Sequence, residues 1–329
     1  MAVDTESGRA MNQTLVMAGT IAGVLAGVLV AASLLIWGER RLLAVWQDRS
    51  GPNRVGPLGL GQVAADVVKI LTKEDWIPPF ADKPIFVLAP MIIMTTTLLS
   101  FAVICFGPSA VVADLNVGLL FFLAMSAMGV YSVVLAGWAS NSKYPLLGAM
   151  RAAGQMFGYE VFMGLSLMGV VMCAGSFNLR EIVLAQRHVW FCVPQVLGLV
   201  IFLIAGFAET RRLPLDLPET ENELVAGYHT EYSGMKFGMF YVGEYVGVVL
   251  VSSLITVLFF GGWLGPWLPG VVWFCIKTLV FVCFFVLCRA TLMRPRYDQL
   301  MSFGWKVLLP LSLANLLVTA AVVLVRGGQ

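Results

Sequence analysis

Residues 237–260 read FGMFYVGEYVGVVLVSSLITVLFF, an apolar run that carries one charged side chain, Glu244. At ~1.5 Å per residue, a helix of this length crosses the ~30 Å hydrocarbon core of a bilayer. Over all 329 residues, 59% are hydrophobic and 12% are charged, whereas soluble domains are about one quarter charged. These values exclude a water-soluble enzyme and predict a protein of the lipid bilayer.

Similar apolar runs recur along the whole chain, with no polar block large enough to fold alone. Because these runs are continuous and do not alternate over ~10 residues, they exclude a transmembrane β-barrel. We therefore predict an all-α polytopic membrane protein, a single integral membrane domain over residues 1–329. The first run lacks a small-residue cleavage site, so we expect a retained helix and not a signal peptide. The eight predicted spans are about 15–37, 84–106, 117–139, 155–175, 190–208, 237–260, 269–288 and 303–325.

The basic residues predict the orientation. Fifteen of the 21 Lys and Arg residues lie in the loops that follow the first, third, fifth and seventh spans. Because Lys and Arg are enriched in cytoplasmic loops, we predict that these four loops are cytoplasmic and that both termini are periplasmic.

Few residues could hold a cofactor. Both histidines, His188 and His229, lie in predicted loops, and the six cysteines form no C-x-x-C pair. A helix-borne haem site and an iron–sulfur cluster are therefore not expected. Since the phosphate-binding Walker A pattern is also lacking, we predict that this chain binds no metal and no redox cofactor.

Residues 60–73 predict an amphipathic helix lying flat at the cytoplasmic interface. Its apolar side chains fall on one helical face and its polar ones on the other. A helix that merely covers the bundle and one that lines a functional site remain equal alternatives. The polar face consists of Gln62, Asp66, Lys69 and Lys73.

The predicted loop at 209–236 is unusually acidic. Six of the chain's 19 carboxylates fall between Glu209 and Glu231. A charged run is usually a solvated loop, but leucines are interleaved with these acids, which favours a packed segment. Carboxylates crowded in a packed site have raised pKa values and can exchange protons.

Two more acids lie inside predicted spans, Glu160 and Glu244, and Glu39 and Glu209 end spans at the same predicted level. An ionised group in hydrocarbon costs at least ~2.5–3.5 kcal/mol and usually marks an ion or proton path. The alternative is that each acid is only a salt-bridge partner of a nearby arginine. The residues alone thus indicate an acidic cytoplasmic pocket rimmed by arginines, which could serve proton transfer, an amphiphilic ligand, a docked protein or a proton-coupled transporter.

Several motifs strongly resemble the H-type membrane subunits of bacterial NADH:quinone oxidoreductase (respiratory complex I), the counterparts of mitochondrial NADH dehydrogenase subunit 1. The first loop reads ERR at 39–41 and QDRSGPNRVGPLG at 47–59. The likeness covers essentially the whole chain, with one departure, Thr210-Arg211-Arg212, where Arg212 is the matching arginine and Arg211 is expected to be peripheral. The other matching segments are 65–69, 72–74, 137–144, 149–152, 158–161, 208–232, 243–245 and 294–299.

The resemblance implies a membrane subunit in the bacterial inner membrane that forms the quinone entrance and much of the lower quinone channel, and links quinone reduction to proton translocation. Quinone would be the substrate, and FMN and iron–sulfur clusters would belong to partner subunits. The implied partners are other membrane-arm subunits, peripheral-arm subunits and lipid, without nucleic acid. The implied channel residues are Arg40, Arg49, Asp66, Tyr241 and Arg289, and the implied proton-coupling residues are Glu39, Glu160, Glu209, Asp216, Glu219, Glu221, Glu223 and Glu244.

Three alternatives belong to other classes. A homologous membrane protein of a hydrogenase-type complex would need no quinone, but the first and third cytoplasmic loops match the quinone-using branch. A stand-alone transporter is disfavoured because no internal repeat is visible. A purely structural anchor would not need Glu160 and Glu244 inside helices.

Overall fold

A computed structural model describes the backbone of residues 2–108 and 110–327 and the side chains of residues 15–108, 110–220 and 223–325. Within these residues the chain is helical and contains no β-strand, which confirms the all-α class. The longer helices are α1 (Ala2–Trp46), α3 (Lys83–Ser100), α4 (Gly118–Ala139), α5 (Lys143–Ala174), α7 (Val196–Glu209), α9 (Gly234–Phe259), α10 (Gly270–Thr291) and α12 (Leu309–Gly327). The shorter ones are α2 (Gly61–Thr72), α6 (Leu179–Ala185), α8 (Glu221–Leu224) and α11 (Tyr297–Phe303).

Seven helical segments of the described chain are long and apolar enough to span a membrane, in agreement with seven of the predicted spans. The run at 190–208 differs, because its helix α7 begins only at Val196 and has 14 residues, about 21 Å. Pro194 lacks an N–H and stops a helix from continuing toward residue 190. Residues 191–195 instead form turns, and the Cys192 N–H donates to the carbonyl of Phe259 at the end of α9.

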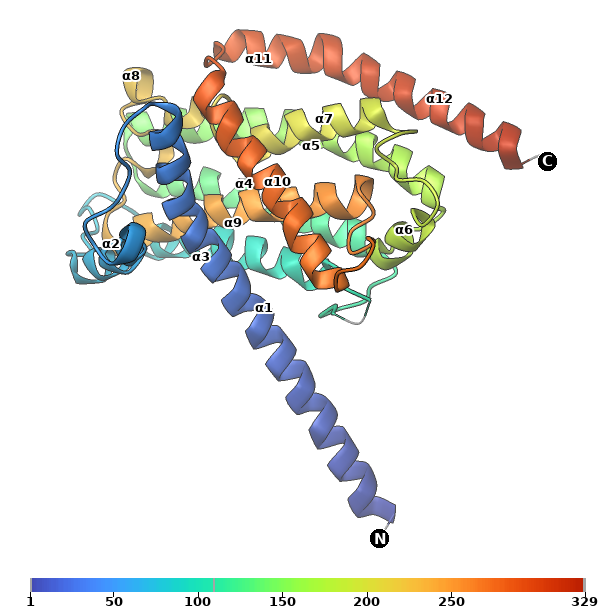
Figure 1. Cartoon of the computed structure of the whole chain (residues 1–329). Helices are drawn as coiled ribbons and strands as arrows, with labels where there is room; N and C mark the ends of the chain where they lie inside the picture. Colours follow the sequence, from blue (N-terminus) through green and yellow to red (C-terminus); the bar gives the residue numbers. More distant parts are fainter. Residues whose placement is uncertain (1, 109, 328–329) are drawn as a thin grey trace.

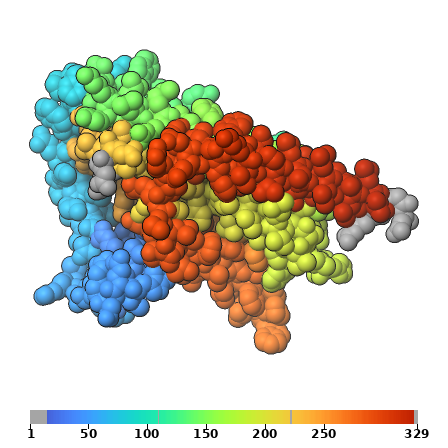
Figure 2. All heavy atoms as spheres, turned by 90° about the horizontal axis from the view of Figure 1, so that it is seen from above, coloured from blue at the N-terminus to red at the C-terminus, as the bar shows by residue number. Residues whose placement is uncertain are grey.

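Helix α9 forms the centre of the bundle (Figure 1). Every residue from Val248 to Phe259 is buried, because α3, α10, α1 and α7 all pack against this helix. By contrast, α1 and α12 are mostly exposed. Figure 2 shows α12 lying along the outside of the molecule and extending beyond the helices beneath it.

Two helices run further than predicted, and in each case packing explains the extra turns. Helix α5 starts at Lys143 and not near residue 155, and its added turns press against the loop after α7. A Cβ at Gly148 would lie 2.7 Å from the Cα of Gly227. Helix α1 continues to Trp46, and its extension buries Glu39 and Ala44.

The four loops that the charge distribution assigned to one side lie together at one end of the bundle, which we call the loop end (Figure 1). Ion pairs join them across long sequence distances: Lys236 with Asp75, Arg151 with Glu223, and Arg294 with Asp216. The structure thus groups these loops as the Lys and Arg distribution predicts. The compartment that they face stays a prediction.

The helix α2 agrees with the predicted amphipathic segment at 60–73. It packs against α1 and α9, and none of its residues is fully buried. Val67, Val68 and Leu71 remain exposed, as expected for a helix at the surface of the bundle.

Candidate functional site

The first buried acidic group lies between α4, α5 and α7. The Ser126 hydroxyl of α4 is 2.7 Å from Oε1 of Glu209 and 3.4 Å from Oε1 of Glu160. A serine has one proton to donate, and the shorter distance indicates that it goes to Glu209. We call Glu160, Ser126 and Glu209 the serine cluster.

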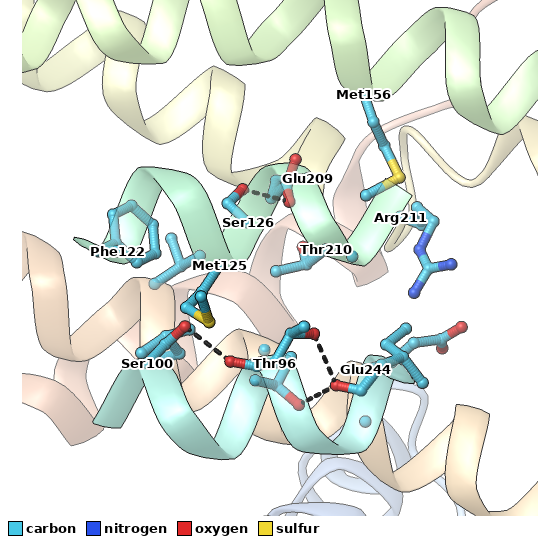
Figure 3. A pocket seen from close by; sticks show the side chains of 17 residues that line it. Thr96, Ser100, Phe122, Met125, Ser126, Met156, Glu209, Thr210, Arg211 and Glu244 are labelled. Atoms are coloured by element: carbon cyan, nitrogen blue, oxygen red, sulfur yellow. Dashed lines mark hydrogen bonds between the residues drawn. The ribbon is translucent and has the colours of Figure 1, made fainter. Parts of the chain in front are cut away.

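A cavity of about 50 Å³ connects this cluster with the next (Figure 3). Its wall includes Glu209 at one side and Arg211 and Glu244 at the other. Thr96 and Ser100 of α3 also line it. One water needs about 10–15 Å³ of such space. The cavity is therefore large enough for a short chain of hydrogen-bonded waters.

The second group surrounds Tyr228, which follows α8 and is fully buried. Its hydroxyl accepts a hydrogen bond from Nη1 of Arg211 at 3.0 Å and lies 3.2 Å from Oε1 of Glu219 and 3.1 Å from Oε1 of Glu244. We call Arg211, Glu219, Tyr228 and Glu244 the tyrosine cluster. It combines three residues of the loop after α7 with one residue of α9.

Arg211 was expected to be peripheral, and this expectation is wrong. Its side chain is only 3% exposed, and its guanidinium carbon lies 5.2 Å from the centre of the Tyr228 ring. The Arg211 backbone has a φ of +52°, which turns the chain inward directly after α7. A buried cation between carboxylates stabilises their ionised forms.

The local fold of this loop explains the position of Tyr228. Gly227 has a φ of +60°, and a Cβ there would come within 1.8 Å of the Pro218 carbonyl oxygen. Only glycine fits this close approach. The amide of Gln155 also donates to the carbonyls of Ala208 and Leu215 at 3.0 and 2.8 Å, which fixes the loop onto α5.

Burial sets the protonation of the loop residues in this cluster. It raises the pKa of Glu219 well above its ordinary value, and the nearby Glu244 raises it further. Burial also raises the pKa of Tyr228 and lowers that of His229. The tyrosine therefore stays protonated, the histidine stays neutral near neutral pH, and Glu219 holds its proton more tightly than an exposed carboxyl does.

The third group contains Glu39 of α1, which is 5% exposed. It forms an ion pair with Arg289 of α10, and its Oε2 lies 4.0 Å from Arg212. The Arg212 guanidinium carbon stacks 3.9 Å from the centre of the Tyr245 ring, and Tyr245 shares a hydrogen bond with Tyr241 at 3.1 Å. The contacts of Glu39 with charged groups are thus contacts with arginines, and its role stays a prediction.

A larger cavity of about 460 Å³ at the loop end joins the second and third groups. It is walled by side chains of both signs and by aromatic rings. Asp216, which pairs with Arg294, also faces it. The lining residues are Arg211, Arg212, Leu213, Asp216, Glu219, Ala226, His229, Phe237, Phe240, Tyr241, Glu244, Arg289 and Arg294.

Four further predicted residues with described side chains, Arg40, Arg49, Asp66 and Glu223, do not line this cavity. Arg40 pairs with Asp66 of α2 at 2.9 Å, which ties α2 to the end of α1. Arg49 is exposed and donates to Gln47, two residues away. Glu223 is 55% exposed and pairs with Arg151, and the side chain of Glu221 lies outside the described residues.

Among the described side chains, no group of three or more His, Cys, Asp or Glu residues is close enough to hold a metal ion. The acids instead pair with arginines, a serine and a tyrosine. Such an arrangement can bind and exchange protons.

Sequence reasoning missed Ser126 and Tyr228. Ser126 is an uncharged residue within an apolar run, and serines in such runs commonly bond only to their own helix. Tyr228 lies beside four loop acids, and a tyrosine among carboxylates was an available signal for a shared proton.

Comparison with known proteins identifies the family of the chain. The family model described as NADH dehydrogenase matches residues 19–320. The chain is 64% identical to the H-type subunit of an NADH-quinone oxidoreductase from Methylococcus capsulatus (strain Bath), over 92% of this chain and 96% of that protein. The chain therefore belongs to the NADH dehydrogenase family, in the branch of these H-type subunits, and is a multi-pass membrane component of an oxidoreductase complex.

Proposed function

We propose that this chain forms the quinone entrance and lower quinone channel of a proton-translocating NADH:quinone oxidoreductase and couples quinone reduction to proton translocation through its buried carboxylates. The observation that carries the proposal is the large cavity at the loop end. Arginines and tyrosines line it, and its buried acids lead through the tyrosine cluster and the small cavity to the serine cluster.

The large cavity suits a quinone headgroup. Reducing a quinone to a quinol consumes two electrons and two protons, and charge develops on the quinone oxygens during the reaction. Arg289 and Tyr241 can donate hydrogen bonds to such oxygens. Arg40 and Asp66 join α1 to α2 beside this end and would support the entrance, and Arg49 would lie at its outer rim.

The buried carboxyls would couple quinone reduction to the movement of protons. When a negative charge appears in the large cavity, the pKa values of nearby carboxyls rise and their arginine pairs rearrange. Asp216, Glu219 and Glu244 line the cavity and would respond to this charge directly, with Glu39 responding through Arg289. Glu244, Glu209 and Glu160 would carry the change inward, and Glu221 and Glu223 would lie at the outer side of the loop.

The same proposal covers the topology of the chain in the membrane and its neighbouring subunits in the complex. The chain would cross the bacterial inner membrane eight times, with α7 as the short fifth span and both termini periplasmic. FMN and iron–sulfur clusters would be held by peripheral-arm subunits docked at the loop end, and other membrane-arm subunits and lipid would cover the exposed helices α1 and α12.

A photoreactive quinone analogue in the intact complex tests this proposal. We expect cross-links to the loop after α1 or the loop after α7, and competition by unlabelled quinone. Arg289→Gln should reduce this labelling because it removes a cation from the cavity. Arg296→Gln, a control whose side chain is 78% exposed and pairs with Asp298, should leave it unchanged. Labelling confined to residues 176–195 or 261–269, at the opposite end, would contradict the proposal.

A further inference from the structure

Tyr228 has three polar partners but only one proton. Its oxygen accepts from Arg211 at 3.0 Å, and the oxygens of Glu219 and Glu244 lie 3.2 and 3.1 Å away. A phenol donates one hydrogen bond. If both carboxyls were ionised, one of them would face the phenolic oxygen with no proton between the two atoms, which is repulsive.

Charge balance in the buried cluster leads to the same conclusion. The cation of Arg211 balances one carboxylate. Arg212 also acts on both carboxyls, but it lies 4.0 Å from the buried Glu39 as well. A second ionised carboxyl in the cluster would therefore be only partly compensated, which is unfavourable. His229, whose Nδ1 is 3.9 Å from Glu219, adds no charge because burial lowers its pKa. Glu219 and Glu244 therefore share one proton and one negative charge.

We propose that Tyr228 is a proton-relay residue that connects Glu219 in the loop with Glu244 in α9. In the relay step, the protonated carboxyl of Glu219 gives its proton to the Tyr228 oxygen while the Tyr228 hydroxyl proton passes to the carboxylate of Glu244. One O–H bond forms and one breaks at the tyrosine, which carries no net charge before or after the step. Arg211 holds the phenolic oxygen in place between the two acids.

This inference rests on the proposed function, because the relay would link the quinone cavity to the acid of the central helix. A direct transfer between the two carboxyls is the competing route, since they are also close enough to share a hydrogen bond. The two routes differ in whether the tyrosine hydroxyl is needed. Replacing it with hydrogen separates them.

The experiment compares Tyr228→Phe with Tyr232→Phe in inverted membrane vesicles that contain the whole complex. Tyr232 is a matched control, because it lies four residues away in the same loop and its buried hydroxyl has no hydrogen-bond partner among the described residues. NADH:quinone turnover is measured as a function of pH and divided by the rate with an artificial acceptor, which corrects for the amount of assembled complex.

We expect Tyr228→Phe to lower the corrected turnover about fivefold, the effect of losing one buried hydrogen bond. We also expect the acidic limb of the pH profile to move about 0.7 unit toward higher pH, because the ionised carboxylate loses a donor. Tyr232→Phe should match the wild type in both. A Tyr228→Phe variant with an unshifted pH profile, whatever its rate, would overturn the relay.

Glu244→Gln distinguishes a failure of the relay from a failure of the proposed function. If Glu244→Gln is impaired while Tyr228→Phe behaves like Tyr232→Phe, the relay is wrong and the coupling role of the acids stands. If Glu244→Gln also keeps the wild-type turnover and pH profile, both the relay and the proposed coupling fail.

Discussion

At the scale of single residues, two neighbouring arginines contact different groups of the candidate site. Arg211 points to Tyr228 and the tyrosine cluster, whereas Arg212 stacks on Tyr245 and approaches Glu39. The left-handed backbone of Arg211 makes this division possible, because it reverses the direction of the chain immediately after α7. Both buried acid groups on the loop side thus receive a cation from the same turn.

Glu219 provides a test of pH dependence at this scale. Burial and the neighbouring Glu244 raise the pKa of Glu219 in the folded protein, so the folded state binds its proton more tightly than the unfolded state does. Its contribution to stability is complete below the unfolded pKa and is lost as the pH rises toward the folded pKa. Glu219→Gln cannot lose a proton, so its thermal stability relative to the wild type should increase as the pH rises from about 5 through neutral pH.

The measurement is the temperature of half-inactivation of the purified complex across this pH range. Glu231→Gln is the control, because Glu231 lies in the same loop but outside the tyrosine cluster. Parallel curves for Glu219→Gln and the wild type at every pH would show that Glu219 is not buried against a second carboxyl.

At the scale of elements, α9 carries Tyr241 and, one turn later, Glu244 and Tyr245. The opposite end of this helix is held by Lys277 of α10. The Lys277 ammonium donates to the carbonyls of Phe260, Gly262 and Leu264 at 2.7, 3.1 and 2.7 Å, and it lies 4.6 Å from the centre of the Trp190 ring. The ammonium thus satisfies the carbonyl of the residue that caps α9 and two carbonyls of the turn that follows the helix.

Removing this ammonium should destabilise the chain without changing its chemistry. Lys277→Met leaves three carbonyls without their donor, and we expect a loss of about 2 kcal/mol in stability. The thermal inactivation midpoint of the complex should fall, and the pH profile of turnover should stay the same. Lys306→Met is the comparison, because Lys306 is exposed. Equal midpoints in the two variants would contradict this role of Lys277.

The sequence predicted the helices where the thickness of the bilayer determines their length. Apolar runs of about 20 residues mark the spans because the bilayer core has a fixed thickness. The ends of α5 and α1 depend instead on contacts with loops distant in sequence, such as Gly148 against Gly227, and hydropathy carries no information on these contacts. The late start of α7 was readable in principle from Pro194.

The residues of the candidate site were also predicted only in part. Glu160 and Glu244 stood out because charges inside apolar runs are rare, and the structure places them in separate clusters. Ser126 did not stand out, since both of its partners come from other helices. Tyr228 did not stand out either, since Glu244 comes from α9 and is adjacent to it only after folding. The buried position of Arg211 could not be predicted from the sequence, because it depends on the positive φ that turns this residue inward.

At the scale of the whole molecule, most of the basic residues and the buried acids are gathered toward one end of a largely apolar bundle. Ion pairs join the four loops there, and two cavities continue from this end toward the membrane interior. In the proposed function, partner subunits would deliver electrons at the loop end, and the chain would need no redox cofactor of its own. Its task would be to convert a change of charge in the large cavity into movement of protons.

Glu160 tests this central claim most directly, because it lies furthest along the chain of acids from the loop acid Glu219. Proton translocation and NADH:quinone turnover should be measured in vesicles that contain Glu160→Gln, with Glu181→Gln, an exposed acid at the opposite end, as the control. We expect Glu160→Gln to keep the artificial-acceptor rate and to lose about tenfold or more in both quinone-linked turnover and proton translocation. Wild-type values of both in Glu160→Gln would contradict the account.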